Sequence, residues 1–306
     1  MTSMEIKDLK KQYSEGEIVE GTLTISIDED VKPREIRFSV YGEENTNLSL
    51  DDPTNYYSES NVFYSKDLSD FSKLIWNKSP SSGGADRGIP QVTHNIPFQF
   101  TIPEWAPESY SGKHVWITYR IKANMDLPNK YDVNKEAYFD VLNSHKSPKN
   151  SDSTIFVEAD KTSSTTAILE SQQTREKEGG IRLELEKYSH EYYKGEIITG
   201  KIIIENDAEL TKNLRNIEII LKSLEYATAQ GRHQMSAIQK YLKIIDWKMG
   251  KGEEGKNIII PFDIQIPQEA IKSYVWTLSE YYWVLEAKIN VKFGPDLHAK
   301  AMVTVI

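Results

Sequence analysis

The sequence predicts an all-β protein built from two immunoglobulin-like antiparallel β-sandwich domains in tandem. Short segments of alternating apolar and polar residues recur along the chain, and Gly and Pro separate them, which is typical of antiparallel sandwiches. One module made of several such segments occurs twice in the chain. No apolar stripe of helical spacing has a useful length; only Ala227–Ser236 offers room for a helical turn or two.

The internal repeat sets the domain organisation. Tyr13, Gly16, Glu17 and Gly21 recur with one common offset of 179 residues (192 − 13), beginning at Tyr192. Further along, the segment 96–103 matches 260–267 with an offset of 164 (261 − 97). Because the offset shrinks, the first copy must hold additional residues, which we place in 44–92. We therefore expect a first domain at 1–142, a polar linker at 143–180 and a second domain at 181–306.

Each domain divides into short strands. The turn at 14–17 needs the positive φ that Gly16 supplies, and Pro103 closes a strand. In the first domain we expect strands at 4–10, 18–27, 34–41, 94–102, 115–125 and 136–142. In the second we expect them at 181–187, 197–205, 214–224, 238–247, 258–266, 282–293 and 299–306. In 44–92 we expect only short strand pieces at 62–64 and 74–76.

Composition excludes several classes of function. The chain has no Cys, so a disulfide framework, a Cys-ligated zinc site and a thiol nucleophile are all excluded. A net charge of −9 without a basic block argues against nucleic-acid binding. The sequence shows no signal peptide and no apolar run long enough to span a bilayer, so we expect a cytoplasmic protein. Peripheral attachment to a membrane stays open.

The usual patterns of catalytic and metal sites are missing from the sequence. The six His residues are too widely spaced to suggest a metal site. There is no phosphate-binding Gly loop and no Gly-x-Ser-x-Gly elbow, and the acidic runs at 28–30 and 51–52 lack calcium-loop spacing. We expect no enzyme, no cofactor and no metal.

Four motifs in a fixed order carry a family resemblance. They are Tyr13-x-x-Gly-Glu-x-x-x-Gly21, Pro97-Phe-x-Phe-x-Ile-Pro103, Ser111-Gly-Lys-His114 followed by Tyr119-Arg-Ile-Lys-Ala123, and, in the second copy, Pro261-Phe-x-Ile-x-Ile-Pro267. Together they resemble the arrestin-like family, which includes arrestins, α-arrestins, the arrestin-fold subunit of the retromer coat and a bacterial sporulation-control protein. The resemblance implies two cupped sandwiches and a scaffold role.

The chain also departs from relatives. It has no Pro-Pro-x-Tyr, the motif by which α-arrestins recruit ubiquitin ligases, and we expect no long regulatory tail after Ile306. It resembles most a minimal prokaryotic or early-branching member, or a retromer-type coat subunit.

Five residues are candidates for contacts with partners. Lys10 and Lys11 resemble the tandem lysines that sense receptor phosphates in arrestins; the alternative is a solvated strand end. Tyr56, Tyr57 and Trp76 are aromatic residues in the extra segment of the first copy. One tyrosine of an adjacent pair in a strand must face away from the core, so these residues indicate either a binding surface or packing at the sandwich rim or between the domains.

Two functions fit these observations. The first is a non-enzymatic adaptor for protein partners, such as cytoplasmic parts of membrane proteins or coat subunits, which add an extended segment to a sheet. The alternative is a β-sandwich that binds a carbohydrate or small ligand, suggested by Trp76 and the tyrosines nearby. The sequence leaves the oligomeric state open.

Overall fold

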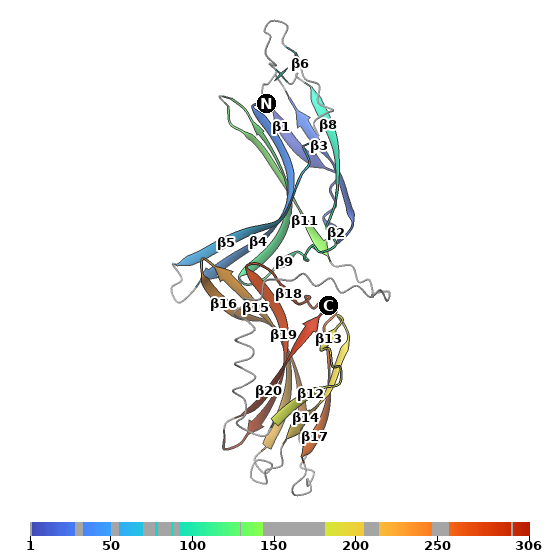
Figure 1. The fold of residues 1–306 in the computed structure, drawn as a ribbon, viewed down its shortest axis with the longest axis vertical. Coiled ribbons are helices and arrows are strands. Elements are labelled where there is room, and N and C mark those ends of the chain that lie inside the picture. The colour runs from blue at the N-terminus through green and yellow to red at the C-terminus, as the bar shows by residue number, and fades with distance from the viewer. Residues whose placement is uncertain are drawn as a thin grey trace. The chain divides into compact units, whose positions relative to one another are not determined.

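The computed structural model describes residues 2–27, 33–49, 55–69, 77–78, 87–88, 92–128, 130–142, 181–204, 214–246, 257–294 and 296–306. The chain divides into two compact units (Figure 1). The first contains the described residues up to Leu142, and the second contains those from Ile181 onward apart from Ala229–Arg232. Every regular element in the described part of the chain is a β-strand, which confirms the all-β prediction. The expected linker at 143–180 lies outside the described residues.

The first unit is a sandwich of a small and a large sheet. The small sheet has the order β1-β3-β8, formed by Ser3–Lys7, Ile18–Ser26 and Thr93–Thr101. The large sheet has the order β2-β11-β10-β4-β5, formed by Gln12–Ser14, Val133–Leu142, Val115–Asp126, Glu35–Ser49 and Tyr56–Asp67, with β9 (Tyr110–Ser111) on β10. A separate pair joins β6 (Asn77–Lys78) to β7 (Arg87–Gly88).

The second unit repeats this plan. Its small sheet has the order β12-β14-β17, formed by Ile181–Leu185, Ile197–Ile204 and Ile258–Gln265. Its large sheet has the order β13-β20-β19-β15-β16, formed by Glu191–Tyr192, Leu297–Val305, Ser279–Val291, Leu214–Ala229 and Arg232–Asp246, with β18 (Tyr274–Val275) on β19. In each unit one short strand pairs in parallel with the last strand, and the other pairings are antiparallel. The sandwich prediction is confirmed.

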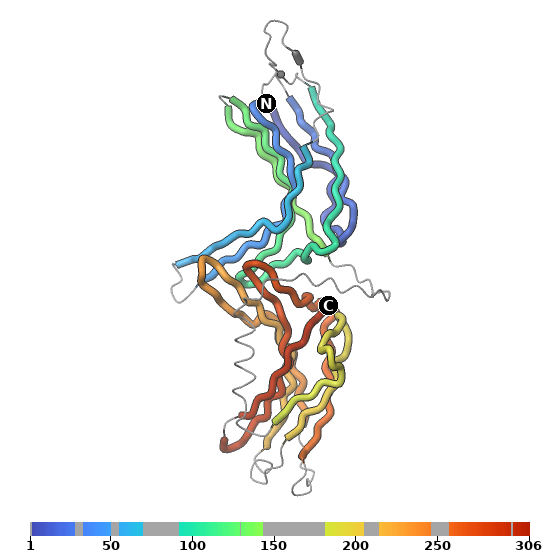
Figure 2. The backbone as a smooth tube through the Cα atoms, viewed as in Figure 1, coloured from blue at the N-terminus to red at the C-terminus, as the bar shows by residue number. Residues whose placement is uncertain are grey.

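The core of each unit lies between its two sheets, whose paths Figure 2 follows. Strand β10 alternates strictly between buried and part-exposed residues, so its odd-numbered side chains fill the core. Phe38, Phe98, Phe100, Tyr119 and Phe139 form the aromatic part of the first core. The even-numbered side chains of β10 therefore cover the outer face of the large sheet.

The repeated Gly-Glu turn has the same structure in both units. Gly16 and Gly195 have φ values of 73° and 80°, which residues with a Cβ rarely adopt. Glu17 accepts a hydrogen bond from the backbone N–H of Ser14 (2.8 Å), and Glu196 accepts one from that of Tyr193 (2.8 Å). The prediction of a structural turn here is correct.

Two local expectations were wrong. Ala227–Ser236 holds no helix: it is the end of β15, a two-residue turn and the start of β16. Gln230 and Gly231 have φ values of 51° and 72°, the conformation of a tight hairpin turn. In the extra segment, β4 runs on to Ser49 and β5 is one strand of 12 residues rather than an isolated piece at 62–64. The piece expected at 74–76 lies outside the described residues.

Candidate binding cleft

The outer face of the large sheet in the first unit carries a row of paired side chains. Arg120 on β10 lies opposite Tyr41 on β4 and Tyr138 on β11. Its guanidinium is 2.7 Å from the carboxylate of Glu43 and 3.3 Å from that of Glu136. Burial opposes the charged form of Arg120, but the hydrogen bond and charge of Glu43 raise its pKa. The row thus cross-links strands β11, β10 and β4.

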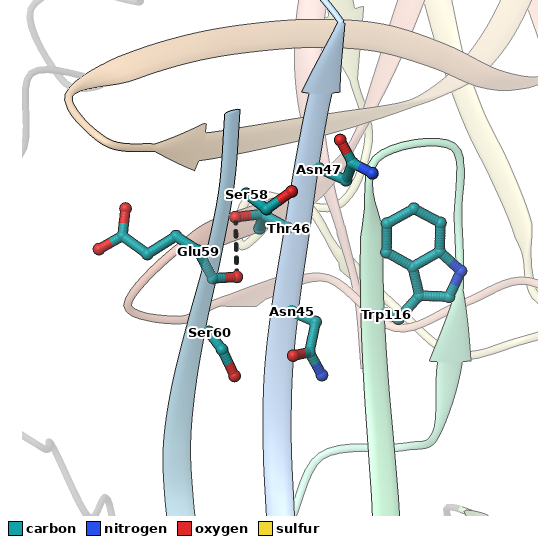
Figure 3. A pocket seen from close by; sticks show the side chains of 7 residues that line it. All are labelled: Asn45, Thr46, Asn47, Ser58, Glu59, Ser60 and Trp116. Carbon is teal, nitrogen blue, oxygen red and sulfur yellow. Dashed lines mark hydrogen bonds between the residues drawn. The ribbon is translucent and has the colours of Figure 1, made fainter. Parts of the chain in front are cut away.

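A shallow cleft lies further along the same face, over the neighbouring strands β5, β4 and β10 (Figure 3). Its volume is about 360 Å³, and it is widely open to solvent. Its lining comes from Asn45, Thr46, Asn47, Ser58, Glu59, Ser60 and Trp116. The strand register explains why these residues meet: Ser60, Asn45 and Trp116 lie side by side on adjacent strands, and Ser58 lies beside Asn47 in the next row. All five occupy outward positions of their strands.

The lining is mostly uncharged and rich in hydrogen-bonding groups. Two amides and three hydroxyls supply donors and acceptors, Trp116 supplies an apolar ring, and Glu59 is the one charged residue in the lining. Thr46 Oγ1 donates to the backbone carbonyl of Glu59 at 3.5 Å, as the dashed line in Figure 3 marks. The cleft therefore suits a polar, uncharged group with one flat apolar side.

Asn47 is the residue of the cleft with an unused polar atom. Its backbone N–H donates to the carbonyl of His114 at 2.9 Å, and its own carbonyl lies 3.2 Å from Nδ1 of His114, so its backbone is held on both sides. Its side-chain Oδ1 is buried and has no hydrogen-bond partner among the described residues. A buried acceptor without a partner costs about 1–3 kcal/mol, so a ligand that donates to it would be bound favourably.

Lys10 is engaged within its own unit. Its Nζ lies 2.9 Å from Glu17 Oε1 and 5.5 Å from the centre of the Tyr13 ring. The hydrogen bond from Lys10 lowers the pKa of the Glu17 carboxyl, and Glu17 in turn raises the pKa of Lys10. Lys187 repeats the arrangement with Glu196 at 3.0 Å in the second unit. The pairing therefore belongs to the repeated module.

The other predicted contact residues lie in different places. Lys11 is exposed, and its carbonyl accepts a hydrogen bond from the backbone N–H of Asp140 at 2.9 Å. Tyr56 is 63% exposed and Tyr57 is part-buried; they precede Ser58 of the cleft on β5. Trp76 lies outside the described residues. The lysines do not line the cleft, whereas the tyrosines directly adjoin its lining.

Sequence reasoning missed the residues that line the cleft. Trp116 sits between Val115 and Ile117, so strict alternation already placed its indole on the outer face of an expected strand. That signal was available. The meeting of Trp116 with Asn45 depends on the register of β10 against β4, which alternation alone does not fix.

Comparison with known proteins identifies the family. Residues 2–147 match the family model described as arrestin (or S-antigen), N-terminal domain. These residues belong to the arrestin N-terminal domain family. The arrestin domain thus contains both sheets of the first unit, including the cleft and the Arg120 row, and the resemblance drawn from the motifs is confirmed.

Two curated relatives extend the similarity past the arrestin domain. The chain is 24% identical over 280 residues to arrestin domain-containing protein 1 of Mus musculus, and equally to that of Rattus norvegicus. The match covers 90% of this chain and 58% of each relative, so the chain spans a little over half of their length. The homology is distant and runs through both units.

The described residues hold neither a candidate metal site nor a candidate membrane-spanning helix. No group of three or more His, Asp or Glu side chains in the described ranges is placed to hold a metal ion. Among the same residues, no helix has the length and apolar character needed to cross a membrane.

Proposed function

We propose that this protein is a non-enzymatic adaptor that binds protein partners through the outer face of the large sheet in its arrestin domain. The observation that carries the proposal is the cleft beside Trp116, which offers a flat ring, amides and hydroxyls on the surface of a domain from a family whose members are typically adaptors. Trp116 is part-exposed, and aromatic residues are enriched at protein interfaces.

The partners we propose are cytoplasmic parts of membrane proteins or subunits of a coat. A surface that recognises an extended segment suits both, because such segments present backbone and side-chain groups together. Tyr56 shares the outward side of β5 with Ser58 and Ser60 and is proposed to extend this surface. Tyr57 faces the opposite side and, with Lys10, Lys11 and Trp76, remains a candidate contact. A cytoplasmic location follows from the same proposal.

A quantitative pull-down tests the adaptor function. The full chain and its Trp116→Ala variant serve as paired baits in native cytoplasm, with mass spectrometry of what each retains. We expect membrane-protein tails or coat subunits on the wild type and a loss of about tenfold or more on Trp116→Ala. Tyr131→Ala, which removes an exposed aromatic ring away from the cleft, is the matched control. Equal recovery on all three baits would remove the cleft from the proposal.

A second candidate function is the binding of a carbohydrate or similar polyol in the cleft. The specific observation in its favour is the buried, unpartnered Oδ1 of Asn47 close to the indole of Trp116, because hydroxyl groups donate hydrogen bonds and the apolar side of a sugar ring stacks on aromatic rings. A thermal-shift screen against glycans distinguishes the two functions. Stabilisation that Asn47→Ala abolishes would favour the polyol, and silence across the screen would favour the adaptor.

A further inference from the structure

The first unit has an exposed aromatic cluster at an open sheet edge, apart from the cleft. Trp105 follows β8 and is 55% exposed. Its ring centre is 6.5 Å from that of Phe63 and 6.3 Å from that of Tyr64, both edge-to-face. Phe63 and Tyr64 belong to β5, which ends the strand order of the large sheet. The exposed indole therefore lies against an edge strand.

A bulge in β5 explains why two consecutive aromatic residues reach Trp105. The register against β4 shifts between Gly42 and Glu43, so Phe63 is the extra residue of β5. At such a bulge two neighbouring side chains share one face of the strand. Gly42 lets the ring of Phe63 approach, because a Cβ there would lie 2.6 Å from Phe63 Cε2.

Two hydrogen bonds hold the loop that carries Trp105. The N–H of Ala106 donates to the carbonyl of Pro103 at 3.0 Å, and the hydroxyl of Tyr119 donates to the carbonyl of Pro107 at 2.7 Å. Phe63 also packs edge-to-face on Tyr119, with ring centres 5.7 Å apart. The indole is thus presented in a fixed position, which lowers the entropy cost of using it for binding.

The second unit shows that the fold does not require this tryptophan. Its matching loop keeps the same contacts: Ala270 N–H donates to Pro267 at 3.2 Å, and Trp283 Nε1 donates to Ile271 at 2.9 Å. At the position of Trp105 the second unit carries Glu269, which is exposed (269 − 105 equals the repeat offset of 164). An exposed aromatic ring at this position is therefore a property of the first unit alone.

The surroundings of Trp105 are acidic. Glu104 precedes it and is exposed, with its Cγ 3.6 Å from where a Cβ of Gly16 would lie, so the Gly-Glu turn adjoins the loop. Glu108 follows on the same loop. Trp105 is therefore carried by a loop that also holds two carboxylates, and a basic segment complements their charge.

We propose that the outer edge of β5 together with Trp105 binds an extended, basic segment of a partner protein, which adds as a strand and lays an apolar side chain on the indole. An edge strand offers unpaired peptide groups for such addition, and no described strand pairs with this edge of β5. Residues on the inner face of an added strand would lie next to Trp105. The inference rests on the proposed adaptor function but uses a surface other than the cleft.

Peptide binding to the full chain tests the inference. The probe is a fluorescein-labelled nine-residue peptide, Lys-Val-Lys-Val-Phe-Val-Lys-Val-Lys, measured by anisotropy against the wild type, Trp105→Glu and Phe293→Glu. Trp105→Glu installs the residue of the second unit and makes the site more acidic, so attraction by charge alone would strengthen its binding. Phe293→Glu is the matched control, because Phe293 is 80% exposed in the second unit.

We expect the Kd to rise about tenfold or more for Trp105→Glu and to stay unchanged for Phe293→Glu. The peptide should also slow amide hydrogen exchange in β5 of the wild type, a readout that does not depend on any variant folding. A version of the peptide with Glu for Lys should bind much more weakly. Undiminished binding to Trp105→Glu, absence of binding, or protection outside β5 would overturn the proposal.

Self-association is the competing occupant of this edge. Sedimentation of the wild type and Trp105→Glu over a range of concentrations decides the matter: a dimer that the substitution dissociates would assign β5 to a second copy and overturn the peptide site. The adaptor function is tested separately from this inference, because its pull-down uses a substitution of Trp116 rather than of Trp105.

Discussion

Gly21 lies directly opposite Phe98 in the small sheet of the first unit, and the Phe98 ring occupies the space that a side chain at position 21 would need. A Cβ on Gly21 would be 2.5 Å from Phe98 Cζ and 2.9 Å from the carbonyl oxygen of Lys7. Gly200 and Phe262 repeat the relationship in the second unit. Two motifs that are far apart in the sequence are therefore a single packing unit.

Gly21→Ala should destabilise the protein by about 1–3 kcal/mol, because the added methyl group forces the ring or the adjacent backbone to move. Urea unfolding of the full chain measures the change. Gly294→Ala is the control, since its nearest neighbour would be 3.6 Å away, and it should stay within about 0.5 kcal/mol of the wild type. Equal effects of the two substitutions would contradict this account.

Lys222→Met should lower the free energy of unfolding, because it removes a charged partner of the buried Glu286 in the second unit. The Glu286 side chain is 9% exposed; burial alone would raise its pKa, but hydrogen bonds from Lys222 and His298, both at 2.7 Å, hold the pKa below its ordinary value. We expect a loss of about 1–3 kcal/mol at pH 7, because a buried carboxylate loses a charged partner.

The pH dependence of that loss checks its cause. Since the folded pKa of Glu286 is lowered, the stability it contributes is present above the ordinary Glu value of about 4.3 and is lost as the pH falls through the folded pKa. The difference between wild type and Lys222→Met should therefore shrink in acid. Lys240→Met, an exposed lysine on β16, serves as the control. A difference that stays constant from pH 7 to pH 3 would refute the electrostatic explanation.

His94 should make the first unit sensitive to mild acid. It is buried on β8, its Nε2 has no hydrogen-bond partner among the described residues, and burial lowers its pKa. Below about pH 6.5 the unfolded chain binds a proton that folded His94 does not, so the free energy of unfolding falls as the pH drops. The contribution reaches at most about 1.4 kcal/mol per pH unit.

His94→Leu should flatten this dependence. Urea unfolding at pH 7.5 and pH 5.5 gives the comparison, and His190→Asn is the control, because Asn tolerates the positive φ of 54° at that position. The hypothesis fails when His94→Leu loses as much stability between the two pH values as the wild type does.

Tyr119→Phe should cost about 1–2 kcal/mol, since it leaves the carbonyl of Pro107 without its 2.7 Å hydrogen bond. Thermal unfolding of the full chain measures the loss. Tyr131→Phe, with the hydroxyl of a fully solvated ring removed, should leave the melting temperature unchanged. A similar response of both variants would mean that the Tyr119 bond contributes nothing.

Much of the fold followed from the sequence, because local signals and tertiary structure agree in these units. The Gly-Glu turn, the alternation in β10 and the Pro-Phe strand each predict a single local structure, and both copies of the repeat predict the same one. The hairpin turn at Gln230 was not predicted from the sequence, because Gln rarely adopts a positive φ and so gives no turn signal.

The cleft could not be predicted because it depends on pairing between distant strands. Asn45 and Trp116 are 71 residues apart (116 − 45), and a shift of one residue would turn the partner side chains to the opposite face. The full length of strand β5 was also missed from the sequence. It is an edge strand with mostly exposed residues, so it shows little apolar alternation.

The parallel pairing of β2 with β11 has a consequence for the order of folding. It joins Gln12 to Asp140, 128 residues apart (140 − 12), so the first sheet is completed only by one of its last residues. Contacts between such distant positions are slow to form, because a long loop must close first. During synthesis the β2–β11 pair therefore cannot form before Leu142 has left the ribosome, and the pair of Glu191 with Thr304 forms equally late in the second unit.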